Sequence, residues 1–313
     1  MRSMVEGAAA QPPLHSGPPP PPSAVPLPRS FAPREEIMKR LIVTADDFGA
    51  SREVNDAVEL AHRDGILTAA SLMVTGAATA DAVERARALP RLGVGLHVLL
   101  VEGRPMLPPE QLPALVAADG NFRTDMVRTA VTIFASPAAR RQLAAEVEAQ
   151  FAAFAATGLP LDHVNAHKHF HLHPTIAGTI LKVGRRYGMK AVRAPIEPGR
   201  VLRTVDGTSA GAGIETVWGK LVRRRMRRAG MAVPDAVFGL AWSGAMTAAR
   251  VRGIIEHLPE GLTEIYTHPA TGSYPGAADG YDYPGELVAL TDRLAQTLIA
   301  REGIARGRFA DFA

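Results

Sequence analysis

Short runs of apolar residues alternate with longer amphipathic stretches from residue 41 to the C-terminus. Such short runs are typical of buried strands, whereas the longer stretches place apolar residues at helical spacing. We therefore predict strands over residues 41–44, 68–74, 94–97, 163–166, 191–193, 236–240 and 264–266. We predict helices over residues 53–63, 80–89, 138–156, 175–187, 248–257 and 286–302. Roughly seven strand–helix units indicate an α/β protein, either doubly wound or closed, and their number favours an irregular TIM-like (β/α) barrel.

Two stretches interrupt this alternation. Residues 102–136 are rich in Pro and Gly, which predicts a long loop over one end of the barrel. Residues 195–235 contain a helical piece, residues 217–229, between flanks without periodicity. Long insertions in barrels often carry specificity. We predict one domain over residues 38–313 with insertions at about 102–136 and 195–235.

Residues 1–37 have no apolar period and include the block from Pro18 to Pro22. This composition predicts a disordered, Pro-rich tail, and no apolar segment follows Arg2 as it would in a signal peptide. Two explanations are open. Met38 is the natural start and the tail is not native, or the tail is a Pro-rich recognition segment.

Composition excludes several classes of protein. With 47% hydrophobic and 21% charged residues, the chain is typical of a soluble globular protein, for which we expect a cytoplasmic location. The net charge of +4 comes with only 5% aromatic residues and no binding motif, so we expect no nucleic-acid partner. Because there are 0 cysteines, any metal must be held by His, Asp or Glu. No apolar run reaches the length of about 18 residues that a membrane-spanning helix needs.

Two adjacent carboxylates, Asp46 and Asp47, follow the first predicted strand and precede a Gly turn and a helix. Neighbouring residues on a strand point to opposite sides, so the two carboxylates converge only if the strand stops there. Two like charges so close together need a cation, or one of them takes up a proton. The alternative is a helix cap made by Asp47 or Ser51.

Five of the ten histidines lie in one short segment, and they are His163, His167, His169, His171 and His173. If this segment is extended, their rings project to one side, again at the C-terminal end of a strand. Imidazoles are the commonest metal ligands, which favours a metal site. A solvated histidine loop and a pH-sensing patch remain alternatives.

Two further histidines, His97 and His268, also close predicted strands. Alone, His97 is better explained as a core or loop histidine with satisfied hydrogen bonds. Four separate strand ends that deliver Asp or His to one barrel mouth are difficult to explain by packing. One metal coordination sphere with an acid and a base beside it explains them together.

The segment from Val217 to Arg228 combines an apolar stripe with five arginines. On a helix, Trp218, Leu221, Val222 and Met226 share one side, which is the pattern of an interfacial helix attracted to anionic lipid head groups. This predicts peripheral contact with the inner face of a membrane. The alternative is a solvated basic face whose stripe packs on the barrel.

These motifs, in this order, resemble the YdjC-like carbohydrate deacetylases, the group that includes the ChbG-type chitooligosaccharide deacetylases. The resemblance extends from Lys39 to the C-terminus. It rests on Thr-Ala-Asp46-Asp47-Phe-Gly, on Gly-Leu-His97, on the block from His163 to His171 and on His268-Pro269. The resemblance implies one divalent metal ion, zinc or magnesium, on Asp47, His97 and His167. It also implies that Asp46 is the general base and His268 the general acid.

The same resemblance implies contacts around the metal. His169 and His171 would contact the sugar or support the ligands, and Arg193 would hold a hydroxyl or a carboxylate. Structural roles for Arg193 are an ion pair with Glu197 or a helix cap. ChbG-type relatives carry Asp where this chain has Asn165, whose neutral amide can orient His167 or a substrate hydroxyl.

Finer cues, including Val192-Arg193-Ala194-Pro195, resemble the hopanoid-biosynthesis-associated (HpnK-type) branch. This implies deacetylation of the N-acetylglucosaminyl head group of a hopanoid lipid. The alternatives are deacetylation of a soluble, chitooligosaccharide-type sugar and an inactive metal- or sugar-binding relative. A glycoside or phosphoester hydrolase is disfavoured because retaining glycosidases need separated carboxylates, whereas Asp46 and Asp47 are adjacent. A homodimer remains open.

Overall fold

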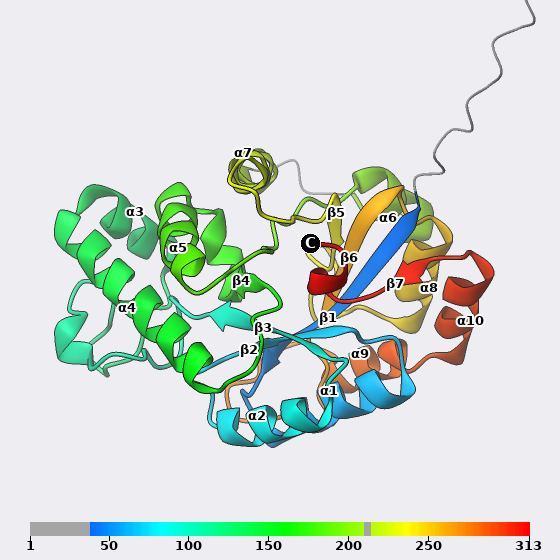
Figure 1. The fold of residues 1–313 in the computed structure, drawn as a ribbon, viewed down its shortest axis with the longest axis horizontal. Coiled ribbons are helices and arrows are strands. Elements are labelled where there is room, and N and C mark those ends of the chain that lie inside the picture. The colour runs from blue at the N-terminus through cyan, green and yellow to red at the C-terminus, as the bar shows by residue number, and fades with distance from the viewer. Residues whose placement is uncertain (1–37, 210–213) are drawn as a thin grey trace, which may run out of the picture. The chain divides into compact units, whose positions relative to one another are not determined.

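A curled sheet of parallel strands, surrounded by helices, forms the centre of the protein in the computed structural model, which describes residues 38–209 and 214–313 (Figure 1). The predicted tail, residues 1–37, lies outside the described residues. The strands are β1 (Lys39–Phe48), β2 (Ala69–Leu72), β3 (Gly93–Val98), β4 (Val164–Ala166), β5 (Ala236–Phe238), β6 (Gly261–Thr267) and β7 (Ala305–Arg306). Their order is β4-β3-β2-β1-β6-β5, with β7 beside β1. This confirms the predicted α/β, TIM-like barrel.

The barrel is irregular where β4 and β5 end the described strand order. The predicted strand at 191–193 is reduced there to single parallel bridges, from Val192 to Val164 and from Ala191 to Ala232. The segment nevertheless crosses the gap between the two sides of the sheet. It therefore carries Arg193 into the barrel interior, where this side chain is fully buried.

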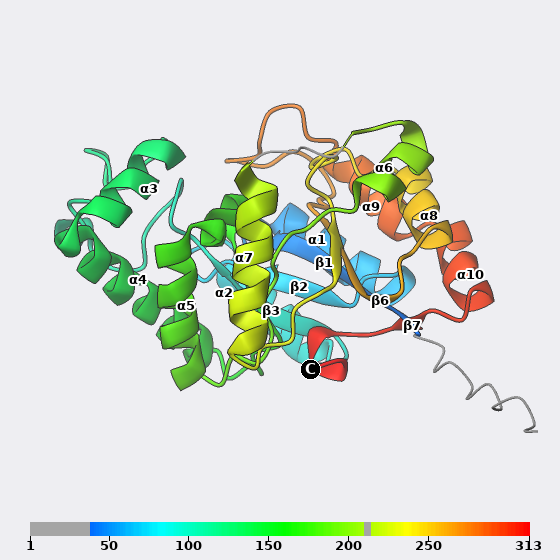
Figure 2. The same ribbon diagram turned by 90° about the horizontal axis from the view of Figure 1, so that it is seen from above.

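Helices cover the outer faces of the sheet, as the two ribbon views show (Figures 1 and 2). They are α1 (Arg52–Asp64), α2 (Thr79–Ala88), α3 (Met126–Ala135), α4 (Pro137–Ala156), α5 (Pro174–Arg186), α6 (Gly199–Asp206), α7 (Ile214–Arg228), α8 (Ala248–Glu256), α9 (Tyr283–Leu290) and α10 (Arg293–Arg301). Short 3-10 turns are η1 (Pro109–Gln111), η2 (His167–Leu172) and η3 (Phe309–Asp311). Within the described residues, no helix is both long and apolar enough to cross a bilayer.

Two predicted segments differ from the structure because of helix caps. The predicted loop over residues 102–136 contains α3, which begins where the Asp125 side chain accepts a hydrogen bond from Arg128 N. The single helix predicted over 286–302 is divided into α9 and α10. Asp292 caps the second of them by accepting a hydrogen bond from Leu294 N.

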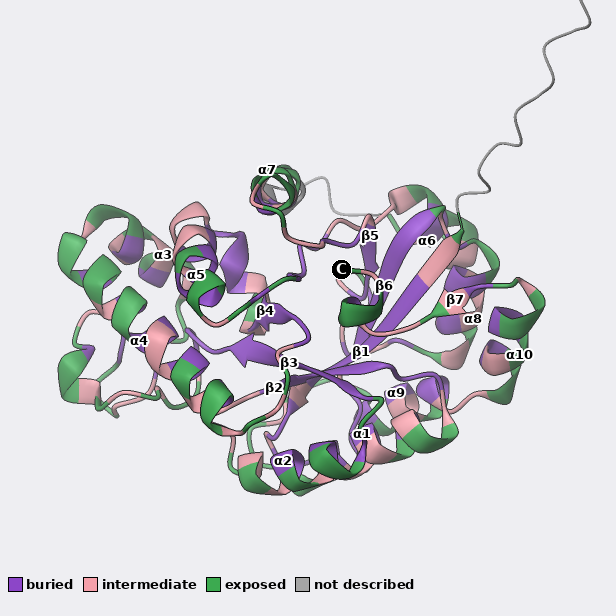
Figure 3. Cartoon of the chain, viewed as in Figure 1, coloured by how far each residue is buried: buried purple, intermediate pink, exposed green. Residues whose placement is uncertain are grey.

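Residues that point into the barrel form an apolar floor and a polar upper part. The floor consists of Ile42, Ala69, Ala191, Leu262 and Phe309, all at most 4% exposed. Side chains alternate along a strand, so every second residue of β1 points the same way. Thr44 and Asp46 therefore point into the barrel, as Ile42 does. The strands are buried along nearly their whole length (Figure 3). The polar upper part therefore lies away from bulk water at the C-terminal ends of the strands.

Two buried side chains of α4 hold the segment that follows β3. Gln150 accepts a hydrogen bond from Leu99 N at 2.9 Å and donates to Leu99 O at 2.6 Å. Glu146 accepts from the backbone N–H groups of Met106 and Leu107 at 2.8 and 3.0 Å. These bonds replace a strand partner for the buried backbone.

We expect Gln150→Leu to reduce the free energy of unfolding by about 2–3 kcal/mol, because both backbone groups of Leu99 lose their partner while staying buried. Urea denaturation with a fixed m-value measures this change. Arg141→Leu, at an exposed position of the same helix, is the matched control and should change stability by less than about 0.5 kcal/mol. A small effect of Gln150→Leu would show that water replaces these bonds.

Candidate active site

The C-terminal ends of four strands meet at one cavity of about 1140 Å³. Asp46 and Asp47 come from the end of β1, His97 from β3, His167 from the residue after β4, and His268 from the residue after β6. All five side chains line the cavity. The structure therefore brings together the polar strand ends that the sequence predicted to converge.

The end of β1 is kinked, which lets both adjacent carboxylates reach the cavity. Asp47 has a φ of 61°, and the pairing with β2 shifts register between Ala45 and Phe48. A non-glycine residue in this left-handed region is strained and often functional. The cap of helix α1 is Ser51, whose side chain accepts a hydrogen bond from Val54 N, and not Asp47.

Asp47, His97 and His167 form a group that fits a divalent cation. Asp47 Oδ1 lies 3.3 Å from His97 Nε2 and 3.4 Å from His167 Nδ1, and one ligand atom of each residue lies within 4.8 Å of the others. Asp47 Oδ1 is buried and has no hydrogen-bond partner in the described chain. One carboxylate and two imidazoles are a donor set typical of zinc and related ions.

The protonation of this group depends on the neighbouring charges. Burial alone would raise the pKa of Asp47, but the two imidazoles hold it well below its usual range. Burial alone would lower the pKa of His167, but Asp47 and Glu102 raise it to about 9. A cation that binds His167 must therefore displace a proton.

Asn165 connects the three candidate ligands Asp47, His97 and His167, called the metal group below, to Asp46. His97 Nδ1 donates to Asn165 Oδ1 at 2.7 Å, because an amide oxygen can only accept. In the uncharged ring that a metal requires, the Nε2 lone pair of His97 is consequently directed toward Asp47. The amide nitrogen of Asn165 donates to Asp46 Oδ1 at 3.0 Å and to Ser71 Oγ at 2.8 Å. We expected Asn165 to orient His167 or a hydroxyl, whereas it orients His97.

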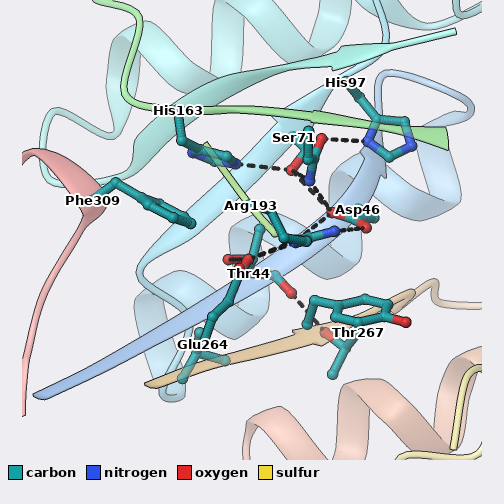
Figure 4. A network of polar contacts seen from close by, with 12 residues as sticks. Thr44, Asp46, Ser71, His97, His163, Arg193, Glu264, Thr267 and Phe309 are labelled. Atoms are coloured by element: carbon teal, nitrogen blue, oxygen red, sulfur yellow. Dashed lines mark hydrogen bonds and ion pairs between the residues drawn. The ribbon is translucent and has the colours of Figure 1, made fainter. Parts of the chain in front are cut away.

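Arg193 is buried between two carboxylates (Figure 4). Its Nη1 donates to Asp46 Oδ2 at 2.5 Å and its Nη2 to Asp46 Oδ1 at 3.0 Å. Nε and Nη2 also donate to Glu264 Oε1 at 2.9 and 2.7 Å. Burial alone would raise the pKa of Asp46, but Arg193 and His97 hold it well below its usual range, so Asp46 is an anion.

The placement of Arg193 differs from the expected substrate contact. Its side chain is 0% exposed and lies behind Asp46, away from the cavity wall. Its ion pairs are with Asp46 and Glu264. The carboxylate of Glu197, the partner considered from the sequence, instead accepts hydrogen bonds from backbone N–H groups of residues 239–241.

The histidine run is not extended, so its rings do not share one side. Lys168 and His169 have φ values of 50° and 53°, which turns the chain inside η2. His169 reaches the cavity wall, with Nε2 2.8 Å from Tyr266 Oη, whereas buried His171 has Nε2 2.8 Å from Arg193 O. Burial lowers the pKa of His171 to about 4 and that of His169 well below its usual range. His171 therefore supports the backbone of Arg193, and of these two histidines it is His169 that lines the cavity.

His268 lines the same cavity from the end of β6, the strand that pairs with β1. Its ring packs edge-on against Tyr281 and Tyr266, with centroid distances of 5.4 and 5.7 Å. Its backbone N–H donates to buried Glu286, and its ring Nδ1 has no hydrogen-bond partner in the described chain. Packing thus places the ring at the cavity wall.

Three important polar residues were missed from the sequence. Glu264 lies in the middle of an apolar strand, which was the available signal for a buried ion pair. Ser71 lies in the short strand β2 and carries no distinctive motif. Glu102, at φ 56°, approaches His167 with Oε2 3.8 Å from Nε2 and pairs with Lys168. His167, together with Lys168, lowers the pKa of Glu102 to about 2.

The cavity extends from the metal group into an apolar arm. Its walls there consist of Met126, Val127, Ala130, Val131 and Phe134 of α3, Phe170 and Leu172 of η2, and Trp218 of α7. Val127, Val131 and Phe134 are 75%, 61% and 70% exposed, which is unusual for large apolar residues on one side of a helix. One cavity therefore combines a charged end with a long apolar wall.

Comparison with known proteins shows which proteins this chain resembles over most of its length. The family model for YdjC-like protein matches residues 40–301. A carbohydrate deacetylase from Homo sapiens is 31% identical over 85% of this chain and 88% of its own length. A carbohydrate deacetylase from Brevibacillus brevis is 39% identical over 47% of this chain, and the match spans 56% of that relative.

A solved structure shares the whole fold. It is a putative cellobiose-phosphate cleavage protein from Enterococcus faecalis, with a TM-score of 0.70 and 25% sequence identity. The match covers 88% of this chain and 99% of that one.

We expect Arg193→Met to reduce the free energy of unfolding by about 3–5 kcal/mol at pH 8, because two buried carboxylates lose their cation. In the wild type the pKa of Asp46 is depressed, so its contribution to stability is lost only when the pH falls below the unfolded value of 3.8. In the variant, burial raises this pKa, so the destabilisation is relieved as the pH falls. Measured by urea denaturation, the difference in unfolding free energy between the wild type and Arg193→Met should be smaller at pH 5.5 than at pH 8. An equal difference at both pH values would contradict the ion-pair explanation.

Proposed function

The chain belongs to the YdjC-like protein family, and we propose that it is a metal-dependent carbohydrate deacetylase that hydrolyses the N-acetyl group of an amino sugar. The observation that carries this proposal is the group of Asp47, His97 and His167 in the same cavity as Asp46 and His268. The relatives that match most of this chain are named carbohydrate deacetylases.

Asp47, His97 and His167 would hold the cation, whose chemistry is to polarise the acetamido carbonyl and to acidify water. Asp46 is the base that takes the proton of the attacking water. Its Oδ1 accepts hydrogen bonds from Arg193, Ser71 and Asn165, whereas Oδ2 accepts one hydrogen bond from the described part of the chain, donated by Arg193. Because a carboxylate oxygen offers about two lone pairs, Oδ2 is the atom that can receive the proton.

His268 would protonate the departing amine from the end of β6. An amide nitrogen leaves poorly without a proton, so this step needs a general acid. The ring of His268 lines the cavity, and packing against Tyr281 limits its motion. Base and acid thus come from the ends of the two neighbouring strands β1 and β6.

Asp46→Asn should reduce acetate release from N-acetylglucosamine conjugates by about 10²–10⁴-fold, because the amide cannot accept the proton. Acetate is measured by a coupled assay on protein loaded with Zn²⁺ and on protein treated with a chelator, which should be inactive. Asp119→Asn, at an exposed position of the 102–136 region, is the control. Release of free sugar without acetate would favour a glycosidase, and no acetate with any divalent metal would favour an inactive binding protein.

We further propose that the amino sugar is attached to an apolar group, as in an N-acetylglucosaminyl hopanoid. The support for this is the apolar arm, which continues from the metal group along α3 to Trp218. A soluble chitooligosaccharide would leave this arm filled with water, at an unfavourable free energy. Deacetylation of a soluble sugar nevertheless remains the alternative substrate class.

Contact with a membrane would involve only part of α7. Val222 and Met226 are 2% and 0% exposed, so these members of the predicted stripe pack on the barrel. Arg223 and Arg227 donate to the backbone carbonyls of Asp235 and Val233. Exposed Val217 and Leu221 remain available to a lipid surface. We propose that this narrower face of α7 brings the mouth of the cavity to the bilayer.

Val131→Asp and Phe134→Asp should raise the KM for a lipid-linked N-acetylglucosamine by about 10–100-fold, because each removes about 1.5–3 kcal/mol of apolar contact. The KM for N-acetylglucosamine oligomers should stay within about twofold. Val288→Asp, an exposed valine of α9 away from the cavity, is the matched control. Equal effects on both substrates would contradict an apolar aglycone in this arm.

A further inference from the structure

A chain of buried hydrogen bonds leads from Asp46 away from the cavity (Figure 4). Ser71 Oγ donates to Asp46 Oδ1 at 2.9 Å and lies 3.0 Å from His163 Nε2. His163 Nδ1 lies 3.0 Å from Asp162 Oδ2. Ser71 and His163 are 0% exposed, and Asp162 is 6% exposed. This chain of hydrogen bonds is therefore shielded from solvent and cannot contact a substrate.

The ring of His163 is held on both faces. On one side, a Cβ atom at Gly95 would lie 2.5 Å from the ring, so only glycine leaves room there. On the other side, Phe309 of η3 stacks on the ring with a centroid distance of 4.3 Å and an interplanar angle of 20°. The ring consequently has one orientation as long as the C-terminal turn is docked.

Asp162 fixes where the ring hydrogen lies. Its carboxylate accepts hydrogen bonds from Phe309 N at 3.3 Å and from Ala310 N at 2.9 Å. Because an ionised carboxylate only accepts, the hydrogen between Asp162 and His163 is on Nδ1. The same carboxylate thus docks the C-terminal turn and orients His163.

Ser71 connects the hydrogen bonds of His163 to Asp46, the proposed base. Its hydroxyl accepts from Asn165 Nδ2 at 2.8 Å, and it has one hydrogen to donate. Asp46 Oδ1 and His163 Nε2 both lie within 3.0 Å of it. The position of His163 Nε2 therefore determines the position of Ser71 Oγ, and with it the direction of the bond to Asp46.

We propose that Ser71 and His163, fixed by the docked C-terminal turn, are positioning residues for the Asp46 carboxylate. This inference rests on the proposed role of Asp46 as the base. Arg193 holds the edge of the carboxylate and supplies its charge compensation, whereas Ser71 fixes the rotation that aims Oδ2 at the cavity. A base that is misplaced by a fraction of an ångström loses rate without loss of substrate binding.

Ser71→Ala should lower kcat by about 10–100-fold and leave KM within about twofold. The affinity for Zn²⁺, measured by competition with a chromophoric chelator, should also stay within about twofold, because Asn165 still orients His97. His163→Gln should lower kcat similarly, and the double variant should lose no more than either single variant, because both act through one chain. Phe309→Leu is a milder second variant if His163→Gln does not fold.

Thr68→Val is the matched control, since it also removes a buried hydroxyl beside β2. Its hydroxyl bonds only to the backbone of Val43, so the variant should lose stability but keep kcat. The proposal is overturned if Ser71→Ala keeps the kcat of the wild type. It is also overturned if the Zn²⁺ affinity falls as much as kcat, which would place the effect on His97 instead of Asp46.

Histidine ring NMR on ¹⁵N-labelled protein tests the chain without substrate. The resonance pair that disappears in His163→Gln should show a hydrogen on Nδ1, and Ser71→Ala should shift its Nε2 signal. If the wild type releases no acetate, the assignment of the base falls together with the proposed function. An unchanged Nε2 signal in an active enzyme overturns the positioning chain alone.

Discussion

The ion pairs of Arg193 are the interaction on which the interior of this barrel depends. Asp46 and Glu264 are both buried at the upper end of the barrel, and one guanidinium binds both of them. With Asp47, there are three carboxylates and one guanidinium, so two negative charges remain once His167 has given up its proton to bind a metal. A divalent cation on Asp47, His97 and His167 has the charge that closes this balance. Burying charges is tolerable only when they are paired, so the metal group and Arg193 are two parts of one electrostatic arrangement.

The strand ends could be predicted because they depend on local pattern. Apolar runs that end in Asp or His were sufficient to place Asp46, His97 and His268 at one mouth, since parallel strands bring their C-terminal ends together. The partners of Arg193 could not be predicted in this way. Asp46 and Arg193 are 147 residues apart in the sequence, and their contact depends on a segment that forms only isolated bridges. Glu264 within apolar β6 was the one local sign of such a pair.

Predictions failed where a backbone angle or a single capping residue decided the structure. The parity of the histidine run assumed an extended chain, but Lys168 and His169 adopt left-handed angles, and this separates His169 from His171. The region of residues 102–136 is rich in Pro and Gly, yet Asp125 begins a helix within it. That helix supplies the exposed Val131 and Phe134 of the cavity wall. The apolar arm is thus a tertiary feature, because its other wall, Trp218, comes from a distant helix.

Asp46 lies where two separate networks meet, and this gives its two oxygens different roles. One network, through Arg193 and Glu264, compensates its charge. The other, through Ser71, Asn165 and His163, occupies Oδ1 and connects it to the floor of the barrel. A carboxylate held only by Arg193 could present either oxygen to the cavity, whereas one held by both networks presents Oδ2 alone. The depressed pKa of Asp46 keeps it anionic, and the second network gives this weak base a fixed direction. In the proposed role of Asp46 as the base, geometry therefore contributes more than basicity.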